Sequence, residues 1–220
     1  MSILVVGATG QTGKHIVREL VDKKVPVKAL VRDLEKAKQL LPAEVELCVG
    51  DVLKPETLEK AIVGCDSIIC ATGASPSLDF TQPYLVDYQG TKNLVDIAKE
   101  KKIEHFVIVS SLCVSKFFHP LNLFWLVLFW KKKAENYLQK SGLNYTIVRP
   151  GGLKNEDNDN NIVMSSADTL FEGSIPRQKV AQVCVEAIFE PTAKNKIVEI
   201  VAKPEIEPKT WGELFSGIVN

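Results

Sequence analysis

The chain has no excess of either charge and no apolar run long enough to cross a bilayer. Lysine plus arginine and aspartate plus glutamate both number 27. Without a net charge the chain has no general attraction for polyanions, so nucleic acid is not an expected partner. Its longest apolar stretch, residues 117–130, has 14 positions, whereas a membrane-spanning helix needs about 20.

The cysteines show no pairing motif. There are five of them, an odd number, none stands in a Cys-x-x-Cys pair, and most lie in apolar runs. We expect reduced thiols in a cytosolic-type compartment and predict no metal site. The chain enters its first expected strand directly, which predicts no signal or transit peptide, although a plastid protein after removal of its transit peptide gives the same pattern.

Internal repeats and interdomain linkers are also lacking. A chain of 220 residues that is 45% hydrophobic is long enough to bury the core of one α/β domain. We therefore predict a single domain over residues 1–220, with a peripheral tail at 204–220.

A glycine-rich turn follows the first apolar run, residues 3–6. Gly7 permits the tight turn, Gly10 lets the backbone approach a phosphate, and Gly13 lets the following helix pack close to the strand. The free N–H groups at the start of that helix can hold a pyrophosphate. The expected phosphate-binding residues are Gly7, Thr9, Gly10, Gln11, Thr12 and Gly13.

Strand-like and helix-like segments alternate along the rest of the chain. Hydrophobic periodicity predicts strands at 27–31, 45–49, 67–70, 106–109, 144–148 and 196–201. It predicts helices at 34–41, from Pro55, and at 83–101, 131–140, 176–189 and 211–218. This alternation is typical of a doubly wound parallel sheet with helices on both faces, the Rossmann architecture.

The end of the second strand carries the choice of cofactor. Arg32 can bind a ribose 2′-phosphate, as in NADP, whereas an acidic residue there would accept from the free 2′-hydroxyl of NAD. Arg32 comes first and favours NADP. Asp33 is either the cap of the next helix or a ribose contact.

The ends of the later strands supply the other expected cofactor contacts. Asp51, with Val52, is either an adenine contact or a turn residue. Small residues let the backbone pass close to the ribose and phosphate, and a hydroxyl can bind the nicotinamide or a substrate carbonyl. These further contacts are Ala71, Thr72, Gly73, Ser110, Ser111, Pro150 and Gly151.

The segment 117–130 is the least ordinary part of the sequence, and the cluster Lys131-Lys132-Lys133 follows it. We predict a helix that is apolar all round and therefore buries more than one face. Its possible partners are the core, a second subunit, a bulky apolar substrate, another protein or a membrane surface. The acidic, amide-rich residues 155–161 are expected to form a mobile loop beside the substrate.

Together these motifs resemble those of the atypical short-chain dehydrogenase/reductases. Within that group the chain is similar to the biliverdin-IXβ/flavin reductases and to the NADP-binding module of the chloroplast inner-envelope import component. The resemblance implies a cytoplasmic location, in a cyanobacterial cytosol or a plastid stroma. The segments that carry it are 7–13, 31–33, 50–52, 109–111 and 141–152.

One departure from the family pattern bears on the chemistry. Active members usually carry Tyr-x-x-x-Lys, in which the lysine lowers the pKa of a proton-donating tyrosine. Lys131 matches the family lysine, but Val127 stands at the position of the tyrosine. The biliverdin-IXβ/flavin reductases also lack the tyrosine and pass hydride to a planar ring.

The resemblance therefore implies an NADPH-dependent reductase of a flavin, such as FMN, or of a linear tetrapyrrole (bilin). Ser111 would orient the acceptor or the nicotinamide, Lys131 would hold the ribose or acceptor carboxylates, and backbone at Pro150 and Gly151 would fix the carboxamide. One alternative is a non-catalytic NADP sensor or assembly scaffold that docks through residues 117–130. Another, a sugar-nucleotide epimerase, is disfavoured by the missing tyrosine and the short C-terminal part.

Overall fold

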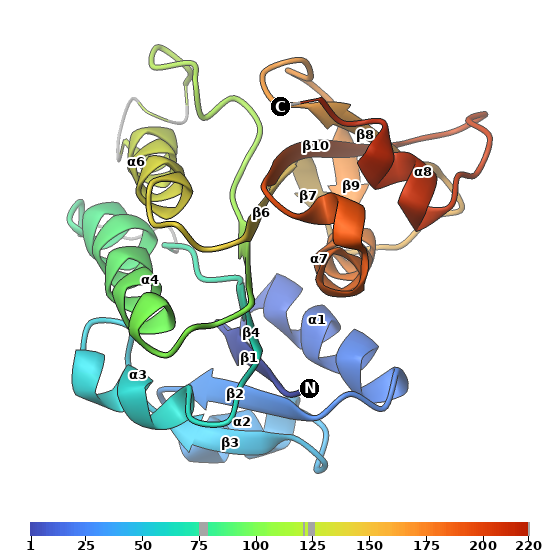
Figure 1. Cartoon of the computed structure of the whole chain (residues 1–220). Helices are drawn as coiled ribbons and strands as arrows, with labels where there is room; N and C mark the ends of the chain where they lie inside the picture. The colour runs from blue at the N-terminus through green and yellow to red at the C-terminus, as the bar shows by residue number, and fades with distance from the viewer. Residues whose placement is uncertain (75–78, 121, 123–125, 220) are drawn as a thin grey trace.

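A mostly parallel sheet forms the centre of the protein (Figure 1). The computed structural model describes residues 1–74, 79–120, 122 and 126–219. Within them, the main sheet has eight strands in the order β3-β2-β1-β4-β5-β6-β10-β8. The strands are β1 (Ile3–Val6), β2 (Val27–Val31), β3 (Glu46–Val49), β4 (Ser67–Cys70), β5 (His105–Val109), β6 (Tyr145–Pro150), β8 (Asn161–Ser166) and β10 (Lys196–Lys203).

The strand order reverses between β1 and β4. From β3 to β10 all neighbouring strands are parallel, and only β8 runs antiparallel to β10. Such a reversal leaves a crevice at the carboxyl ends of the strands, where doubly wound proteins bind their ligands. The predicted fold class is therefore confirmed.

Helices cover both faces of the sheet because its central strands are apolar on both sides. In β1, Ile3 and Val5 join one hydrophobic cluster with α1, α2, α7 and α8, whereas Leu4 and Val6 join another with α3, α4 and α6. Figure 1 shows α3, α4 and α6 on one side and α1 and α7 on the other. The helices are α1 (Gln11–Asp22), α2 (Leu34–Leu40), α3 (Pro55–Ala61), α4 (Thr91–Glu100), α6 (Val127–Gln139), α7 (Arg177–Phe189) and α8 (Trp211–Ser216), with a short 3-10 turn at Pro191–Ala193.

The helix expected at 83–101 is present, but its first half is a π-helix, η1 (Pro83–Gly90), which continues directly into α4. π-Helical turns are rare and frequent at functional sites. In η1 the wider turn carries Asp87, whose side chain is buried.

The helix expected over residues 117–130 was wrong at 117–120 and at 126. Phe117 and Phe118 lie in turns, and α6 begins only at Val127, after Leu126 in a left-handed conformation (φ 51°). Asn122 explains the late start, because its Oδ1 accepts hydrogen bonds from the backbone N–H groups of Leu128 (2.9 Å) and Phe129 (3.2 Å). A side chain that caps the first turn fixes the beginning of the helix. Positions 121 and 123–125 of the segment lie outside the described residues.

Short strands between β6 and α7 were not predicted. β7 (Gly152–Lys154) and β9 (Ser174–Pro176) form a small parallel sheet, and β8 pairs with β10. The loop expected at 155–161 ends at residue 160, since Asn161 begins β8. Strands of three residues, and strands held by partners tens of residues away, leave little periodicity in the sequence.

The C-terminal tail packs against the sheet. Thr210 and Glu213 form a capping box at the start of α8, and Phe215 is fully buried. Lys196 on β10 donates to the backbone carbonyls of Phe215 and Ile218, at 2.7 and 2.8 Å. The tail therefore contributes to the core.

Candidate functional site

The glycine turn joins β1 to α1 so tightly that two of its glycines are required by space. A Cβ on Gly7, whose φ is +83°, would lie 2.7 Å from the carbonyl carbon of Ala71, and one on Gly13 would lie 2.1 Å from the Gly7 carbonyl oxygen. Gly10 differs, because the nearest atom to its Cβ position is the Gly7 oxygen at 3.1 Å, with nothing else within 4 Å. Beyond that oxygen, this side of Gly10 is open.

The start of α1 fits an anionic group. Gly10 provides no side-chain cap, and the first turn contains no acidic residue. Lys14 makes the first bond of the helix, to the Gly10 carbonyl at 3.0 Å, so the N–H groups of Gln11, Thr12 and Gly13 have no helical partner. Three free N–H groups beside an open backbone are the arrangement that binds a pyrophosphate.

At the end of β2, Arg32 and Asp33 differ in whether their side chains have a partner. Asp33 accepts a hydrogen bond from the Lys36 backbone N–H at 3.0 Å and caps α2, so the capping alternative is the one observed. Arg32 is exposed and has no ion-pair partner in the described part of the chain. Its guanidinium is therefore free to bind a 2′-phosphate.

At the end of β3, the Asp51 side chain closes a turn. Its Oδ1 accepts from the Leu53 backbone N–H at 2.9 Å, and Asn93 on α4 donates to the Val52 carbonyl at 2.9 Å. Val52 packs against Gly90, where a Cβ would come within 2.6 Å of a Val52 methyl group. The turn role is observed, and the adenine contact stays a prediction.

Lys131 forms a buried ion pair beside the end of β4. Its Nζ lies 2.8 Å from Oδ1 of Asp87, and the exposed fractions of the two side chains are 16% and 1%. The other carboxylate oxygen of Asp87 accepts from the Ala74 backbone N–H at 3.2 Å. Both charged groups lie against Gly73, since a Cβ there would be 3.8 Å from Asp87 Oδ1 and 3.9 Å from Lys131 Nζ.

These residues line a small pocket at the carboxyl ends of the strands. Thr72 and Ser110, both predicted cofactor contacts, face it together with Lys131 and Asp87. Sequence reasoning missed Asp87. The signal was available, because Asp87 is the single charged residue of the π-helical stretch PYLVDYQG.

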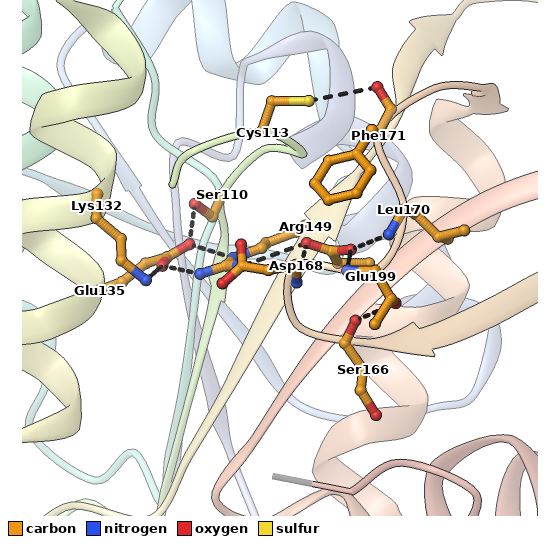
Figure 2. Close-up of polar contacts among 11 residues, drawn as sticks. Ser110, Cys113, Lys132, Glu135, Arg149, Ser166, Asp168, Leu170, Phe171 and Glu199 are labelled. Carbon is orange, nitrogen blue, oxygen red and sulfur yellow. Dashed lines mark hydrogen bonds and ion pairs between the residues drawn. The ribbon is translucent and has the colours of Figure 1, made fainter. Parts of the chain in front are cut away.

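Ser110 and Ser111 differ in what their hydroxyl groups do. The Ser110 hydroxyl is buried and donates its proton to Oε1 of Glu135 on α6, at 2.6 Å (Figure 2). Its lone pairs remain, so toward a ligand Ser110 acts as a hydrogen-bond acceptor. Ser111 is half-buried and its hydroxyl makes no hydrogen bond within the described residues, so it can still donate.

Glu135 belongs to a buried cluster of charges centred on Arg149 (Figure 2). Arg149 Nε and Nη2 donate to the two oxygens of Glu135, at 2.9 and 2.7 Å, and Lys132 Nζ lies 3.6 Å from Glu135 Oε2. Arg149 Nη1 donates to Asp168 at 3.0 Å and to Glu199 at 3.2 Å. Although burial alone would lower it, the pKa of Arg149 is raised by Glu135 and the other carboxylates, which keep the guanidinium charged.

Glu199 connects this cluster to the loop that follows β8. Its carboxylate accepts backbone hydrogen bonds from Asp168 (2.9 Å), Thr169 (3.0 Å) and Leu170 (2.7 Å). The loop is thereby tied to the same guanidinium that holds Glu135 and, through it, Ser110. None of these contacts was predicted from the sequence. Glu199, a charged residue inside the apolar strand KIVEIVAK, was the visible signal.

Backbone groups at the end of β6 already have partners. The Leu112 N–H donates to the Pro150 carbonyl at 3.0 Å, and the Gly151 N–H donates to the Ile200 carbonyl at 2.9 Å. A Cβ on Gly151 would lie 2.6 Å from the Gly173 carbonyl oxygen. Gly151 is therefore required by the close approach of residue 173, a reason that the sequence did not reveal.

The reversed strand order, the glycine turn and the lysine at the carboxyl edge define a Rossmann protein of the atypical short-chain dehydrogenase/reductase type. Residues 7–191 match the model of a family described as NAD(P)H-binding. The chain belongs to this family, and its cofactor is NAD(P)H.

Curated relatives extend this result. A chloroplastic protein of Arabidopsis thaliana is 45% identical, over 98% of this chain and 82% of the relative. Protein TIC 62 of Pisum sativum is 38% identical over 91% of this chain, which spans 43% of that longer protein. Sanguinarine reductase of Eschscholzia californica is 33% identical over all of this chain and 97% of the enzyme.

Solved structures show the same fold. A protein of Bacillus halodurans described as an NAD-dependent epimerase/dehydratase superimposes with a TM-score of 0.87, at 27% identity over 99% of both chains. The anaerobilin reductase ChuY of Escherichia coli O157:H7 gives 0.78, at 22% identity over 95% of this chain and 100% of the other.

The described ranges contain neither a membrane-spanning helix nor a metal-ligand cluster. No helix there is long and apolar enough to cross a bilayer. Groups of three or more potential metal-ligating side chains are likewise absent from that part of the chain.

Proposed function

We propose that the protein is an NADPH-dependent reductase that passes hydride to a planar conjugated acceptor, a flavin such as FMN or a bilin. The observation that carries this proposal is the pair Val127 and Lys131, one helical turn apart on α6. Valine has no proton to donate, so a simple carbonyl would lack its acid. A conjugated ring system can accept hydride and take its proton from water.

The relatives support the same reaction class. Sanguinarine reductase is a reductase by name and matches this chain over nearly its whole length. Reduction of an acceptor by NADPH is therefore the activity that we carry over, while the acceptor itself comes from the chemistry of the site.

We assign the residues as follows. Bound NADPH would supply the hydride. The glycine turn at 7–13 would hold its pyrophosphate, Arg32 its 2′-phosphate, and the ends of β3 and β4, at 51–52 and 71–73, its adenosine and ribose. Lys131 would hold a ribose hydroxyl or an acceptor carboxylate, oriented by Asp87. The protein's main contribution would be position.

Ser110 and Ser111 would complement each other at the reacting end. Ser110, whose proton is already donated to Glu135, would accept from an N–H or O–H of the cofactor. Ser111 would donate to the acceptor. Pro150 would offer the second lone pair of its carbonyl to the carboxamide, since Leu112 occupies the first.

The decisive experiment is NADPH oxidation, followed by absorbance, with FMN and with biliverdin as acceptors, beside calorimetric titration with NADPH and NADH. Turnover well above the rate without enzyme, with NADPH preferred, supports the proposal. Tight NADPH binding without turnover of either acceptor contradicts it.

A second candidate is a non-catalytic NADP-dependent scaffold, and a specific surface favours it. Phe118 is 95% exposed and Phe117 54% exposed, in the turns before α6. The photosystem II assembly factor Ycf39 of Cyanophora paradoxa is 41% identical over 70% of this chain, which spans 46% of that factor. Exposed aromatic side chains beside lysines suit a protein or membrane surface.

Flotation with anionic vesicles, with and without NADPH, tests this candidate. A scaffold that senses the cofactor binds differently in the two states. Equal binding of vesicles in both states, or no binding, rules out the scaffold candidate.

For the location we propose a plastid stroma or a cyanobacterial cytosol, which fits the chloroplastic relatives.

A further inference from the structure

A second cavity lies between the first turns of α6 and the turns that precede it. It encloses about 230 Å³ and is lined by Val114, Ser115, Phe117, Asn122, Phe129, Lys132, Lys133 and Asn136. Pockets that bury a whole drug-sized ligand measure about 300–1,000 Å³. This cavity is therefore of a size for part of a ligand.

Two walls of the cavity are aromatic. The rings of Phe117 and Phe129 meet edge to face, with centroids 6.0 Å apart. The Asn122 amide is occupied, because it donates to the Phe117 carbonyl at 2.9 Å and caps α6. Asn136, in contrast, has no side-chain hydrogen bond within the described residues and can bind a ligand oxygen.

Positive charge dominates the polar part of the lining. Lys132 and Lys133 both face the cavity, and no acidic residue does so among the described lining residues. Lys133 is exposed, and its Nζ lies 5.5 Å from the centroid of the Phe129 ring. Lys132 lies near the carboxylate of Glu135, but that carboxylate is already paired with Arg149. The cavity therefore has an unmatched positive charge.

One buried side chain, Glu135, lies between a residue of this cavity and a residue of the predicted reaction site. Glu135 receives the Ser110 hydroxyl on one oxygen, and Lys132 lies 3.6 Å from the other. Ser110 lines the pocket of Lys131, whereas Lys132 lines the larger cavity. A ligand whose ring lies beside Ser110 would have to extend a chain past Glu135 to reach Lys132 and Lys133.

We infer that this cavity binds the anionic tail of the acceptor, a phosphate or carboxylate group held by Lys132 and Lys133. The chain that joins this group to the ring packs against Phe117 and Phe129. The inference rests on the proposed function, because it assumes a planar acceptor beside Ser110. It adds that the acceptor carries a negative charge on a side chain. The site should therefore bind FMN more tightly than riboflavin, or a bilin more tightly than its ester.

Direct binding tests this without turnover. Flavin fluorescence is titrated with the wild-type protein and with Lys133→Gln, and matched titrations use FMN and riboflavin, which differ by the phosphate. We expect about fivefold weaker FMN binding in Lys133→Gln, about the worth of one partly exposed ion pair, with riboflavin unchanged. Lys140→Gln, which removes the same charge from the other end of α6, is the control and leaves both affinities unchanged.

A second pair of titrations tests whether the anionic group is a carboxylate. Biliverdin and its dimethyl ester are titrated in the same way by absorbance, and a carboxylate held in the cavity makes the free acid bind more tightly in the wild type than in Lys133→Gln. Lysine dependence with FMN alone assigns the tail as phosphate, and with biliverdin alone as carboxylate.

The two proposals can fail separately. Lysine-dependent binding of FMN without NADPH oxidation supports the tail site and rejects the reductase. Turnover in which Lys133→Gln affects FMN and riboflavin equally, or in which Lys140→Gln matches Lys133→Gln, overturns the tail site. Failure of both FMN and biliverdin to bind overturns it as well.

Discussion

Arg149 holds Glu135 by two parallel hydrogen bonds, at 2.9 and 2.7 Å, and both side chains are fully buried. The pair ties β6 to α6. Removing one partner leaves an uncompensated charge in the core, which costs about 3–5 kcal/mol. We therefore expect Glu135→Gln to lower the free energy of unfolding in urea by about 3 kcal/mol.

Glu100→Gln, at the exposed end of α4, is the matched control and changes stability by less than about 0.5 kcal/mol. Equal stability of Glu135→Gln and the wild type would show that the pair contributes nothing net. A double variant, Glu135→Leu with Arg149→Met, is expected to recover part of the loss, although Glu199 then loses its cation.

The two neighbouring serines predict opposite kinds of defect. Ser111→Ala removes a free hydroxyl, so under the proposed function it lowers kcat about tenfold and leaves the Kd for NADPH nearly unchanged. Ser110→Ala removes a buried bond to a carboxylate, which costs about 1.5–3 kcal/mol of stability.

Stopped-flow turnover, NADPH titration and urea unfolding, applied to both serine variants, separate the two roles. Unchanged turnover in Ser111→Ala removes its assigned role. Unchanged stability in Ser110→Ala would mean that the hydrogen bond from Ser110 to Glu135 makes no net contribution to the free energy of unfolding.

Arg32 predicts the cofactor preference. Arg32→Ala removes a cation from the expected 2′-phosphate site, so the Kd for NADPH rises about 10- to 100-fold and that for NADH does not change. Lys36→Ala, on the exposed side of the following helix, is the control for general charge. Calorimetric titration with both cofactors measures the difference, and a loss that is equal for NADPH and NADH places Arg32 outside the phosphate site.

Local residue chemistry explains what the sequence could predict. Gly7 and Gly13 are required by contacts within a few residues or with the adjacent strand, so their spacing was informative. The fold class follows similarly from alternating apolar segments. Asp33 shows the limit, because the sequence was compatible with a cap and with a ribose contact, and only the bond from Lys36 in the fold shows the cap.

The rest of the site depends on contacts distant in sequence. Glu135 and Glu199 reach Arg149 across 14 and 50 positions, and Lys131 reaches Asp87 from another helix. No local periodicity encodes such pairs. The prediction of a helix over 117–130 failed for a different reason. Apolar character alone does not reveal that Asn122 caps the first turn of α6 and so fixes where the helix begins.

The Lys131 and Asp87 pair predicts a positional effect. Asp87→Asn removes the anion that holds Lys131, so we expect kcat/KM for NADPH oxidation to fall about tenfold, whereas Lys131→Met lowers it further. Lys131→Arg keeps the charge with a different reach and recovers part of the activity in the proposed site. Identical activity in Asp87→Asn and the wild type would show that the ion pair does not orient the lysine.

His105 predicts the acid limit of stability. It lies at the start of β5, where burial, with a smaller effect of Lys194, lowers its pKa from 6.5 to about 4. Thr146 donates to the Ala193 carbonyl, so it accepts from His105 Nε2, and His105 Nδ1 has no partner in the described structure. The folded state therefore favours the neutral ring.

The sign follows from proton counting. Below pH 6.5 the unfolded chain binds a proton at this histidine, and the folded chain does not until the pH approaches 4, so stability falls with falling pH across this window. The slope approaches about 1.4 kcal/mol per pH unit. Urea unfolding of the wild type and His105→Gln at about pH 7, 6, 5 and 4.5 separates this histidine from the carboxylates that titrate in both proteins. The difference in free energy between the two proteins should shift in favour of His105→Gln as the pH falls, because glutamine takes up no proton in either state. A constant difference over the window would mean that the folded ring takes up its proton at the same pH as the unfolded one, so that burial does not lower its pKa.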